Sequence, residues 1–151
     1  MKCTTVIDKT REEEVVIFVK KESELAKQIE RFVQSRTSEL IGFGLDREAV
    51  PILPRDVTCF IVEDGHVQAL TDRGRYRMRE RLYEIEERLD SEFIKINQSC
   101  IANVSKIKRF DASVMGSLTV IFNCGYRDYV SRRQLKSVKE KIGLTTKRRS
   151  K

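Results

Sequence analysis

From residue 56 onward the sequence is a succession of short apolar runs separated by turn signals, and this pattern constrains the fold more than any other feature. Segments such as DVTCFIVED, HVQALT and RYRMR are rich in β-branched and aromatic residues, and Gly or Asp-Arg-Gly steps separate them. Short runs of this kind are typical of strands joined by tight turns. We therefore expect a mainly β domain with short helices.

Two helices and one hairpin complete this region. RERLYEIEERL places Leu82, Ile85 and Leu89 on one helical face, and RRQLKSVKEKIG forms a terminal helix that ends at Gly143. Between them, FIKINQSCIANV and KIKRFDAS continue the strands, and GSLTVIFNCGYRDYVS predicts a hairpin with its turn at residues 123–125. The order is therefore strands, a helix, more strands and a last helix.

Residues 1–55 predict a small strand–helix–strand leader. EVVIFVKK at residues 14–21 has strand composition, and ESELAKQIERFVQSR has apolar residues at helical spacing after a start signal at Ser23. SELIGFG predicts a second strand, and LDREAVPILPRD, with both prolines, is interpreted as a connector. We assign residues 1–55 to dimerisation or regulation, residues 56–144 to the main domain, and residues 145–151 to a flexible basic tail.

Positive charge is concentrated toward the end of the chain. The net charge is +7, and residues 106–151 contain thirteen basic and three acidic residues, so this part carries +10 and residues 1–105 carry −3. A basic end on a near-neutral body favours a polyanionic partner. The alternative is a well-solvated surface with a basic tail.

No pattern in the sequence supports catalysis or a metal site. The single histidine, His66, follows a glycine turn without an orienting partner, and no phosphate-binding glycine loop is present. A zinc site needs closely spaced ligands, and we interpret the four scattered cysteines as small hydrophobic residues in a reducing compartment: Cys3, Cys59, Cys100 and Cys124. We expect a non-enzymatic protein without cofactors. The start of the chain lacks the apolar core of a secretory signal, so the expected location is the cytoplasm.

Two polar clusters interrupt the strand pattern. Asn97-Gln98-Ser99 follows an apolar strand, and Ser131-Arg132-Arg133-Gln134 opens the last helix. Consecutive polar groups are costly in a core, and Arg, Asn, Gln and Ser are side chains that contact base edges. The alternative for the second cluster is a Ser131 helix cap with its arginines in solvent.

These residues carry a resemblance to the LytTR family of bacterial DNA-binding domains, which end many response regulators. The resemblance covers residues 56 to 143 and includes DVTCFIVEDGHV, FIKINQSCIANVSKI and YVSRRQLKSVKEKIG. The matching positions are Phe93, Ser99, Asn103, Ile107, Val130, Ser131 and Arg132. This sequence departs from the family pattern at Asn97, where a histidine is usual, and at the following Gln98.

The resemblance implies a sequence-specific transcriptional regulator with an elongated β-sheet core whose loops enter successive major grooves. It implies that Gln98 and Arg133 contact base edges, with Asn97 and His66 as further base-edge candidates. Phosphate contacts are implied for Ser99, Arg132, Gln134 and Lys136. Family members bind paired direct repeats, so a homodimer on double-stranded DNA is expected.

The front of the chain resembles that of stand-alone LytTR regulators. Residues 1–55 are too short for a receiver domain, and such regulators are often encoded beside a small membrane protein that would restrain them. Two other functions stay open: a protein-interaction adaptor or anti-activator with a basic end, and an RNA-binding protein. The aromatic residues, however, have core spacing and do not form a stacking platform.

Overall fold

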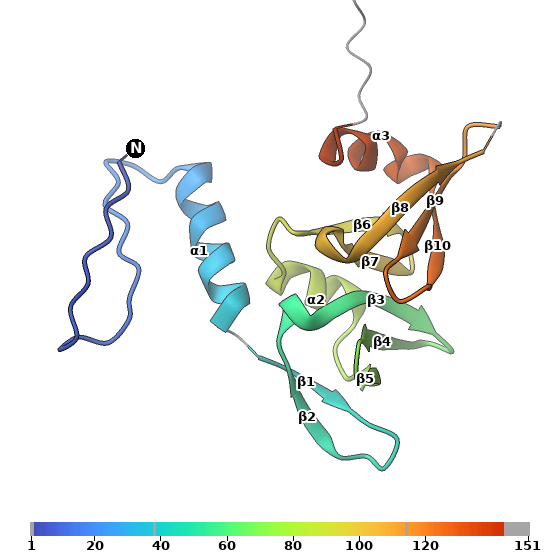
Figure 1. The fold of residues 1–151 in the computed structure, drawn as a ribbon, viewed down its shortest axis with the longest axis horizontal. Coiled ribbons are helices and arrows are strands. Elements are labelled where there is room, and N and C mark those ends of the chain that lie inside the picture. Colours follow the sequence, from blue (N-terminus) through green and yellow to red (C-terminus); the bar gives the residue numbers. More distant parts are fainter. Residues whose placement is uncertain (1, 38, 114, 144–151) are drawn as a thin grey trace, which may run out of the picture.

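The computed structural model of the chain describes residues 2–37, 39–113 and 115–143, and it is mainly β (Figure 1). The helices are α1 (Glu24–Thr37), α2 (Leu82–Arg88) and α3 (Arg132–Lys141), with short 3-10 turns η1 (Pro54–Asp56) and η2 (Val104–Lys106). The strands are β1 (Leu40–Phe43), β2 (Ala49–Ile52), β3 (Val57–Glu63), β4 (His66–Thr71), β5 (Gly74–Met78), β6 (Phe93–Asn97), β7 (Cys100–Asn103), β8 (Ile107–Ala112), β9 (Leu118–Phe122) and β10 (Arg127–Val130).

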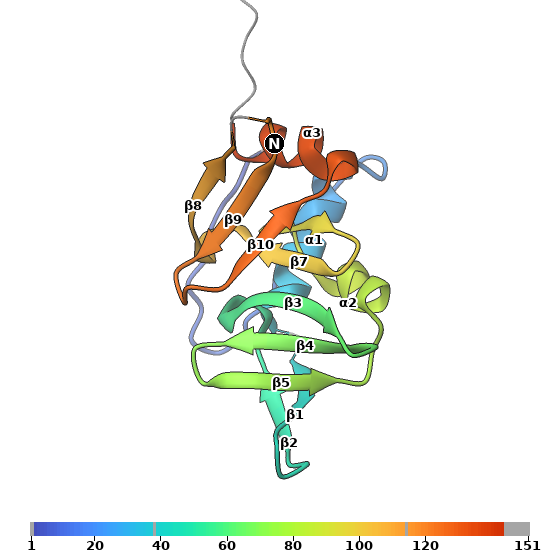
Figure 2. The same ribbon diagram turned by 90° about the vertical axis from the view of Figure 1, so that its right-hand side faces the viewer.

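The strands form two antiparallel sheets. The larger has seven strands in the order β2-β1-β5-β4-β3-β7-β6, and the smaller has three in the order β10-β9-β8. Tight turns connect β3 to β4, β4 to β5, and β6 to β7, as antiparallel neighbours allow. The smaller sheet and α3 lie at one end of the molecule, and β1 and β2 project from the other (Figures 1 and 2).

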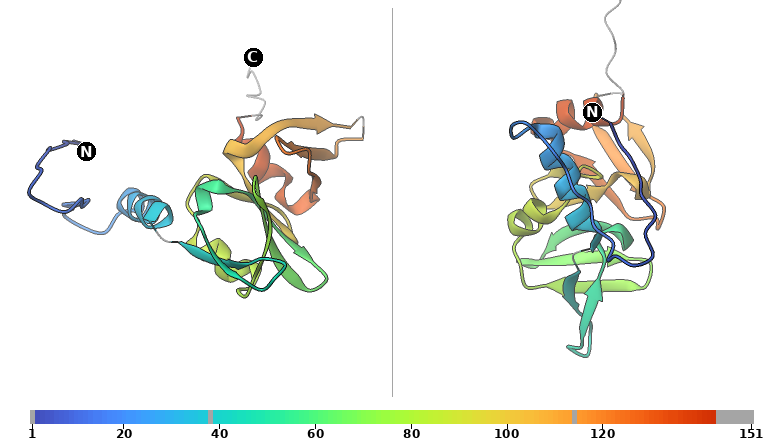
Figure 3. Two further views of the ribbon diagram at one scale, coloured as in Figure 1. Left: turned by 60° about the horizontal axis from the view of Figure 1, so that its bottom comes forward. Right: turned by 90° about the vertical axis from the view of Figure 1, so that its left-hand side faces the viewer.

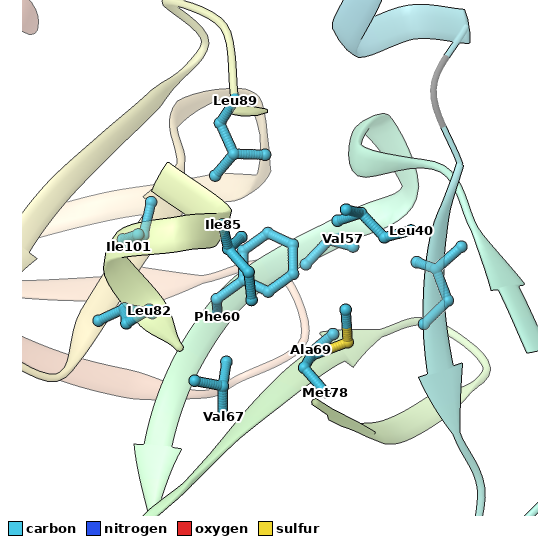
Figure 4. Close-up of a cluster of buried hydrophobic side chains, with 11 residues drawn as sticks. Leu40, Val57, Phe60, Val67, Ala69, Met78, Leu82, Ile85, Leu89 and Ile101 are labelled. Carbon is cyan, nitrogen blue, oxygen red and sulfur yellow. The ribbon is translucent and has the colours of Figure 1, made fainter. Parts of the chain in front are cut away.

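Two hydrophobic clusters cover opposite faces of the central strands. In β3, Phe60 belongs to a cluster with α2, whereas Cys59 and Ile61 belong to a second cluster with the three-stranded sheet and α3. Figure 4 shows the first cluster, in which Ile85 of α2 lies against the Phe60 ring. Because residues 57–61 of β3 are buried on both faces, all of them except Thr58 are apolar.

Most predicted elements are confirmed, and two are corrected. Residues 49–52 form β2, although they were expected to be a connector. Pro51 is compatible with β2 because this strand lies at the edge of the sheet, where a missing N–H is tolerated. Residues 14–21 do not form a strand: they pair with no described strand, and residues 20 and 21 form a bend.

The leader and the main domain share one sheet. β1 pairs with β5 as well as with β2, so residues 40–52 are continuous with the strands that follow. The division at residues 55 and 56 therefore stays a prediction, and the predicted tail at 145–151 lies outside the described residues. None of the helices that the structure describes is long and apolar enough to span a membrane.

Candidate nucleic-acid interface

Three junctions between elements lie along the same side of the molecule. They are the turn between β3 and β4, the turn between β6 and β7, and the connection from β10 to α3, all on the right-hand side of Figure 2. His66 begins β4, Gln98 and Ser99 form the second turn, and Arg133 lies in the first turn of α3. The predicted site residues are thus distributed over neighbouring junctions of one side.

Backbone hydrogen bonds hold these junctions together. Val62 N, near the end of β3, donates to Ser99 O at 2.8 Å, and Ser131 N, before α3, donates to Ile96 O at 2.9 Å. At the far end of α3, Lys141 Nζ donates to the carbonyl of Ser91. The turn at residues 98–99 is therefore tied to both of its neighbours, and a rigid scaffold of this kind suits side chains that must reach a ligand.

The structure brings four of the predicted residues into one depression of about 410 Å³. Gln98 and Ser99 come from the β6–β7 turn, and Arg133 and Gln134 come from the start of α3. The lining is completed by residues that the sequence analysis did not assign to the site, Lys95, Tyr129 and Ser131. Since Gln98, Ser99 and Arg133 are exposed, their amide, hydroxyl and guanidinium groups are accessible to a ligand.

Asn97 does not project outward as expected, and its placement is a correction. Its side chain is only 2% exposed. The amide nitrogen donates to Asp128 Oδ1 at 3.0 Å and to the Tyr129 carbonyl at 2.8 Å, and the amide oxygen accepts from Ser99 N at 2.8 Å. Asn97 therefore fastens the β6–β7 turn to β10 and leaves base contacts to its exposed neighbours.

A register irregularity explains why Asn97 turns inward. Strict alternation would place it on the opposite face from Ile96, yet both side chains are buried. The pairing of β6 with β7 shifts between Lys95 and Asn97, and such a bulge redirects the side chains that follow it. The polar step is thus one structural residue followed by two exposed ones.

The first turn of α3 carries positive charge and a free hydroxyl. Arg132 and Lys136 are exposed on this helix outside the depression. Ser131 occupies the N-cap position, but its side chain makes no capping hydrogen bond, so the capping alternative lacks its defining contact. Backbone N–H groups at a helix start favour anions, which makes this turn suitable for phosphate.

His66 lies in a separate and larger depression of about 840 Å³. Arg77 Nη2 lies 2.9 Å from both ring nitrogens of His66, and Arg75 forms an ion pair with Glu63 at 3.0 Å. Arg79 stacks over the Phe43 ring at 4.3 Å. The structure therefore does not bring His66 into the depression that holds Gln98 and Arg133.

The arginines beside His66 were not predicted from the sequence. Arg75, Arg77 and Arg79 alternate along and just beyond β5, and Arg47 joins them from the β1–β2 turn. Side chains two residues apart point to the same face of a strand. The alternation in RYRMR was therefore the signal that could have identified this basic surface.

The cysteines fall into two classes. Cys59 and Cys100 are buried, as expected of small hydrophobic residues, whereas Cys3 and Cys124 are exposed, which corrects that interpretation for both. The hydrogen bond with Cys59, together with burial, raises the pKa of the Cys100 thiol, so it stays protonated and is a poor nucleophile. No group of three metal-ligating side chains occurs among the described residues.

Known proteins match most of the sheet-forming part of the chain. The family model of the LytTr DNA-binding domain matches residues 47–143. The chain belongs to the LytTR family of DNA-binding domains. Uncharacterized HTH-type transcriptional regulators of Staphylococcus aureus, from strains NCTC 8325 / PS 47 and COL, are similar to it. Each is 32% identical over 109 residues, which cover 72% of this chain and 74% of the relative.

A solved structure shares the fold. It is the LytTr DNA-binding domain of a Bacillus cereus protein described as a methyl-accepting/DNA response regulator, and it superimposes with a TM-score of 0.66. The sequences are 20% identical, and the match covers 71% of this chain and 98% of that domain. This LytTR chain has no helix-turn-helix pair among its described residues, because β6–β10 separate α2 from α3. The described part of this DNA-binding domain is therefore built mainly from β-strands.

Proposed function

We propose that this LytTR protein is a sequence-specific transcriptional regulator that binds paired direct repeats as two protomers, with its loops in successive major grooves. The observation that carries the proposal is the shared depression of Gln98, Ser99, Arg133 and Gln134, which two separate chain segments build. The glutamine amide can donate to and accept from an adenine edge, and the arginine guanidinium can donate to the two acceptors of a guanine edge. Double-stranded DNA is therefore the proposed partner. The protein would bind it in the cytoplasm.

In this proposal the residues divide into base contacts and phosphate contacts. Gln98 and Arg133 contact base edges, and His66 contacts DNA from the neighbouring junction. Ser99, Arg132, Gln134 and Lys136 bind phosphate and fix the register. Asn97 contacts no base, because its amide is already used within the protein.

A mobility-shift assay tests the function directly. The probe is the DNA upstream of the protein's own coding sequence, and a scrambled duplex of equal length is the competitor. We expect a shift that the upstream fragment competes away and the scrambled duplex does not. No shift with this fragment or with duplexes selected from a random pool would refute DNA recognition.

Arg133→Ala tests the division of roles. The substitution should cost about 1–3 kcal/mol on the preferred site and leave binding to scrambled DNA nearly unchanged. Arg73→Ala is the matched control, since Arg73 is an exposed residue of the β4–β5 turn, at the opposite end of β4 from His66. Equal losses on both duplexes would make Arg133 a phosphate contact.

A further inference from the structure

The segment 13–21, Glu-Glu-Val-Val-Ile-Phe-Val-Lys-Lys, stands apart from the sheets at the start of the chain (Figures 1 and 3). Residues 13–19 belong to no helix, strand or turn, residues 20 and 21 form a bend, and the segment makes no backbone hydrogen bond to any other described residue. Large apolar side chains are exposed on it, with Phe18 at 92% and Val16 at 57%. An extended, apolar, unpaired edge is a template for another strand.

The side chains of this segment already have two distinct faces. Val15, Ile17 and Val19 line a groove of about 470 Å³ against α1, whose Ala26 contributes to the opposite wall. Val16 and Phe18 alternate with them, and in an extended chain alternate residues point to opposite sides. One face is therefore directed toward the protein's own helix, where Ile17 is half-buried and Val15 and Val19 keep 59% and 44% exposure, while the other face and the backbone edge are left for a partner.

The charge pattern of the segment identifies that partner. Glu13 and Glu14 precede the apolar centre and Lys20 and Lys21 follow it, symmetrically about Ile17. Outside them Glu12 and Glu22 would lie opposite each other with like charge, and Glu22 is already paired with Lys27 at 3.2 Å. If two copies pair antiparallel with Ile17 opposite Ile17, Glu14 lies opposite Lys20 and Glu13 lies opposite Lys21, twice each. Parallel pairing in register would instead place like charges opposite each other. Opposite charges across a strand pair stabilise it and like charges destabilise it.

We propose that residues 13–21 are a homodimerisation strand that pairs antiparallel with the same segment of a second copy about a two-fold axis at Ile17. The pairing covers the exposed Phe18 of each copy with Val16 of the other. A two-fold contact of this kind is isologous, so each copy supplies the same surface. Two paired strands alone are marginally stable, and the adjoining α1 helices cover the groove face of the ribbon.

The free protein leaves these charges available. Glu13, Lys20 and Lys21 form no ion pair within the described part of the chain, and Glu14 approaches only Arg11, at 3.9 Å with both side chains well exposed. An exposed contact at this distance contributes little. Pairing with a second copy would therefore break almost no existing interaction of these charged side chains.

The proposal deepens the proposed function, which requires two protomers on DNA, but its test uses the full chain without DNA. Sedimentation velocity and light scattering measure the oligomeric state of the wild type and of the double variants E13K/E14K and K20E/K21E. The first variant is positive at both ends of the segment and the second is negative at both ends. We expect the wild type to be a dimer and each double variant to dissociate at least about tenfold more readily.

Mixing the two double variants restores every opposite-charge contact, so the mixture should dimerise again. The quadruple variant E13K/E14K/K20E/K21E should form a homodimer like the wild type. A monomeric wild type, double variants that dimerise like the wild type, or a mixture that stays monomeric would each overturn the proposal.

Two controls separate this result from the DNA-binding hypothesis. Far-ultraviolet circular dichroism checks that the variants keep their sheets. R133A, which changes the candidate DNA interface alone, should remain a dimer, and the double variants should still bind a single half-site. If R133A stays a dimer but loses half-site binding, the result supports the DNA interface. If the double variants bind a half-site but no longer dimerise, the result supports pairing through residues 13–21.

Discussion

Replacing Asn97 by alanine distinguishes a residue that supports the candidate interface from one that contacts DNA. The substitution removes three hydrogen bonds, to Asp128 Oδ1, to the Tyr129 carbonyl and from Ser99 N. Each such bond contributes about 0.5–1.5 kcal/mol net. Because the exposed turn at residues 98–99 would admit water to the vacated groups, we expect the lower half of that range for each bond. The expected loss over the three bonds is then about 1.5–3 kcal/mol in the free energy of unfolding.

Gln98→Ala is the matched control, since Gln98 is the exposed neighbour of Asn97. It should change the free energy of unfolding by less than about 0.5 kcal/mol while weakening DNA binding. Urea titrations followed by circular dichroism measure stability, and mobility shifts at low temperature measure binding to DNA by the folded fraction of each variant.

One result would refute this assignment of Asn97. If Asn97→Ala lowered the free energy of unfolding by less than about 1 kcal/mol but weakened site-specific binding as much as Gln98→Ala, the amide would be a DNA contact. The internal hydrogen bonds seen here would then have to open when DNA binds.

Four further expectations follow from particular contacts and charges. Asn103→Ala should destabilise the fold by about 2–4 kcal/mol, as seen in urea unfolding, because this fully buried amide donates to the Val57 carbonyl at 2.9 Å. Gly42→Ala should lower the melting temperature, since its new Cβ would lie 2.7 Å from Tyr76 Cβ, which is attached directly to the backbone, as well as 2.4 Å from Ile52 Cδ1. Burial and the Asp128 carboxylate raise the pKa of Tyr126, so its contribution to stability should be present at neutral pH and be lost above pH ~10. Unfolding measured at alkaline pH checks this, because Tyr126→Phe lacks the phenol and should not show this loss. The logarithm of DNA affinity should fall against the logarithm of salt by about 0.9 for each phosphate contact, and a flat titration would contradict the phosphate contacts.

Local sequence patterns were sufficient for most of the fold. The apolar spacing of Leu82, Ile85 and Leu89 predicted α2, and all three side chains are buried in the cluster that includes Phe60. The hairpin of β9 and β10 followed from its alternation and its turn, since both signals come from adjacent residues. β2 was missed because Pro51 is a strong local signal against a strand, and only its edge position in the assembled sheet makes it acceptable.

The unpaired segment 14–21 is the opposite case, in which local composition predicts a strand that the fold does not contain. Its composition is that of a strand, yet a strand exists only where another backbone supplies hydrogen bonds, and no described strand of the chain does so. Composition therefore indicates that a segment can pair as a strand, but tertiary or quaternary structure decides which backbone it pairs with.

The sequence by itself determined the succession of strands and helices, the concentration of basic residues and the identity of the polar steps, because each depends on neighbouring residues. Only the tertiary structure decided that Asn97 turns inward while Gln98 and Ser99 remain exposed. That outcome depends on a register shift between β6 and β7 and on acceptors in β10, more than thirty residues away. Burial of a polar group is favourable only where distant backbone satisfies it, and a linear pattern does not contain that geometry.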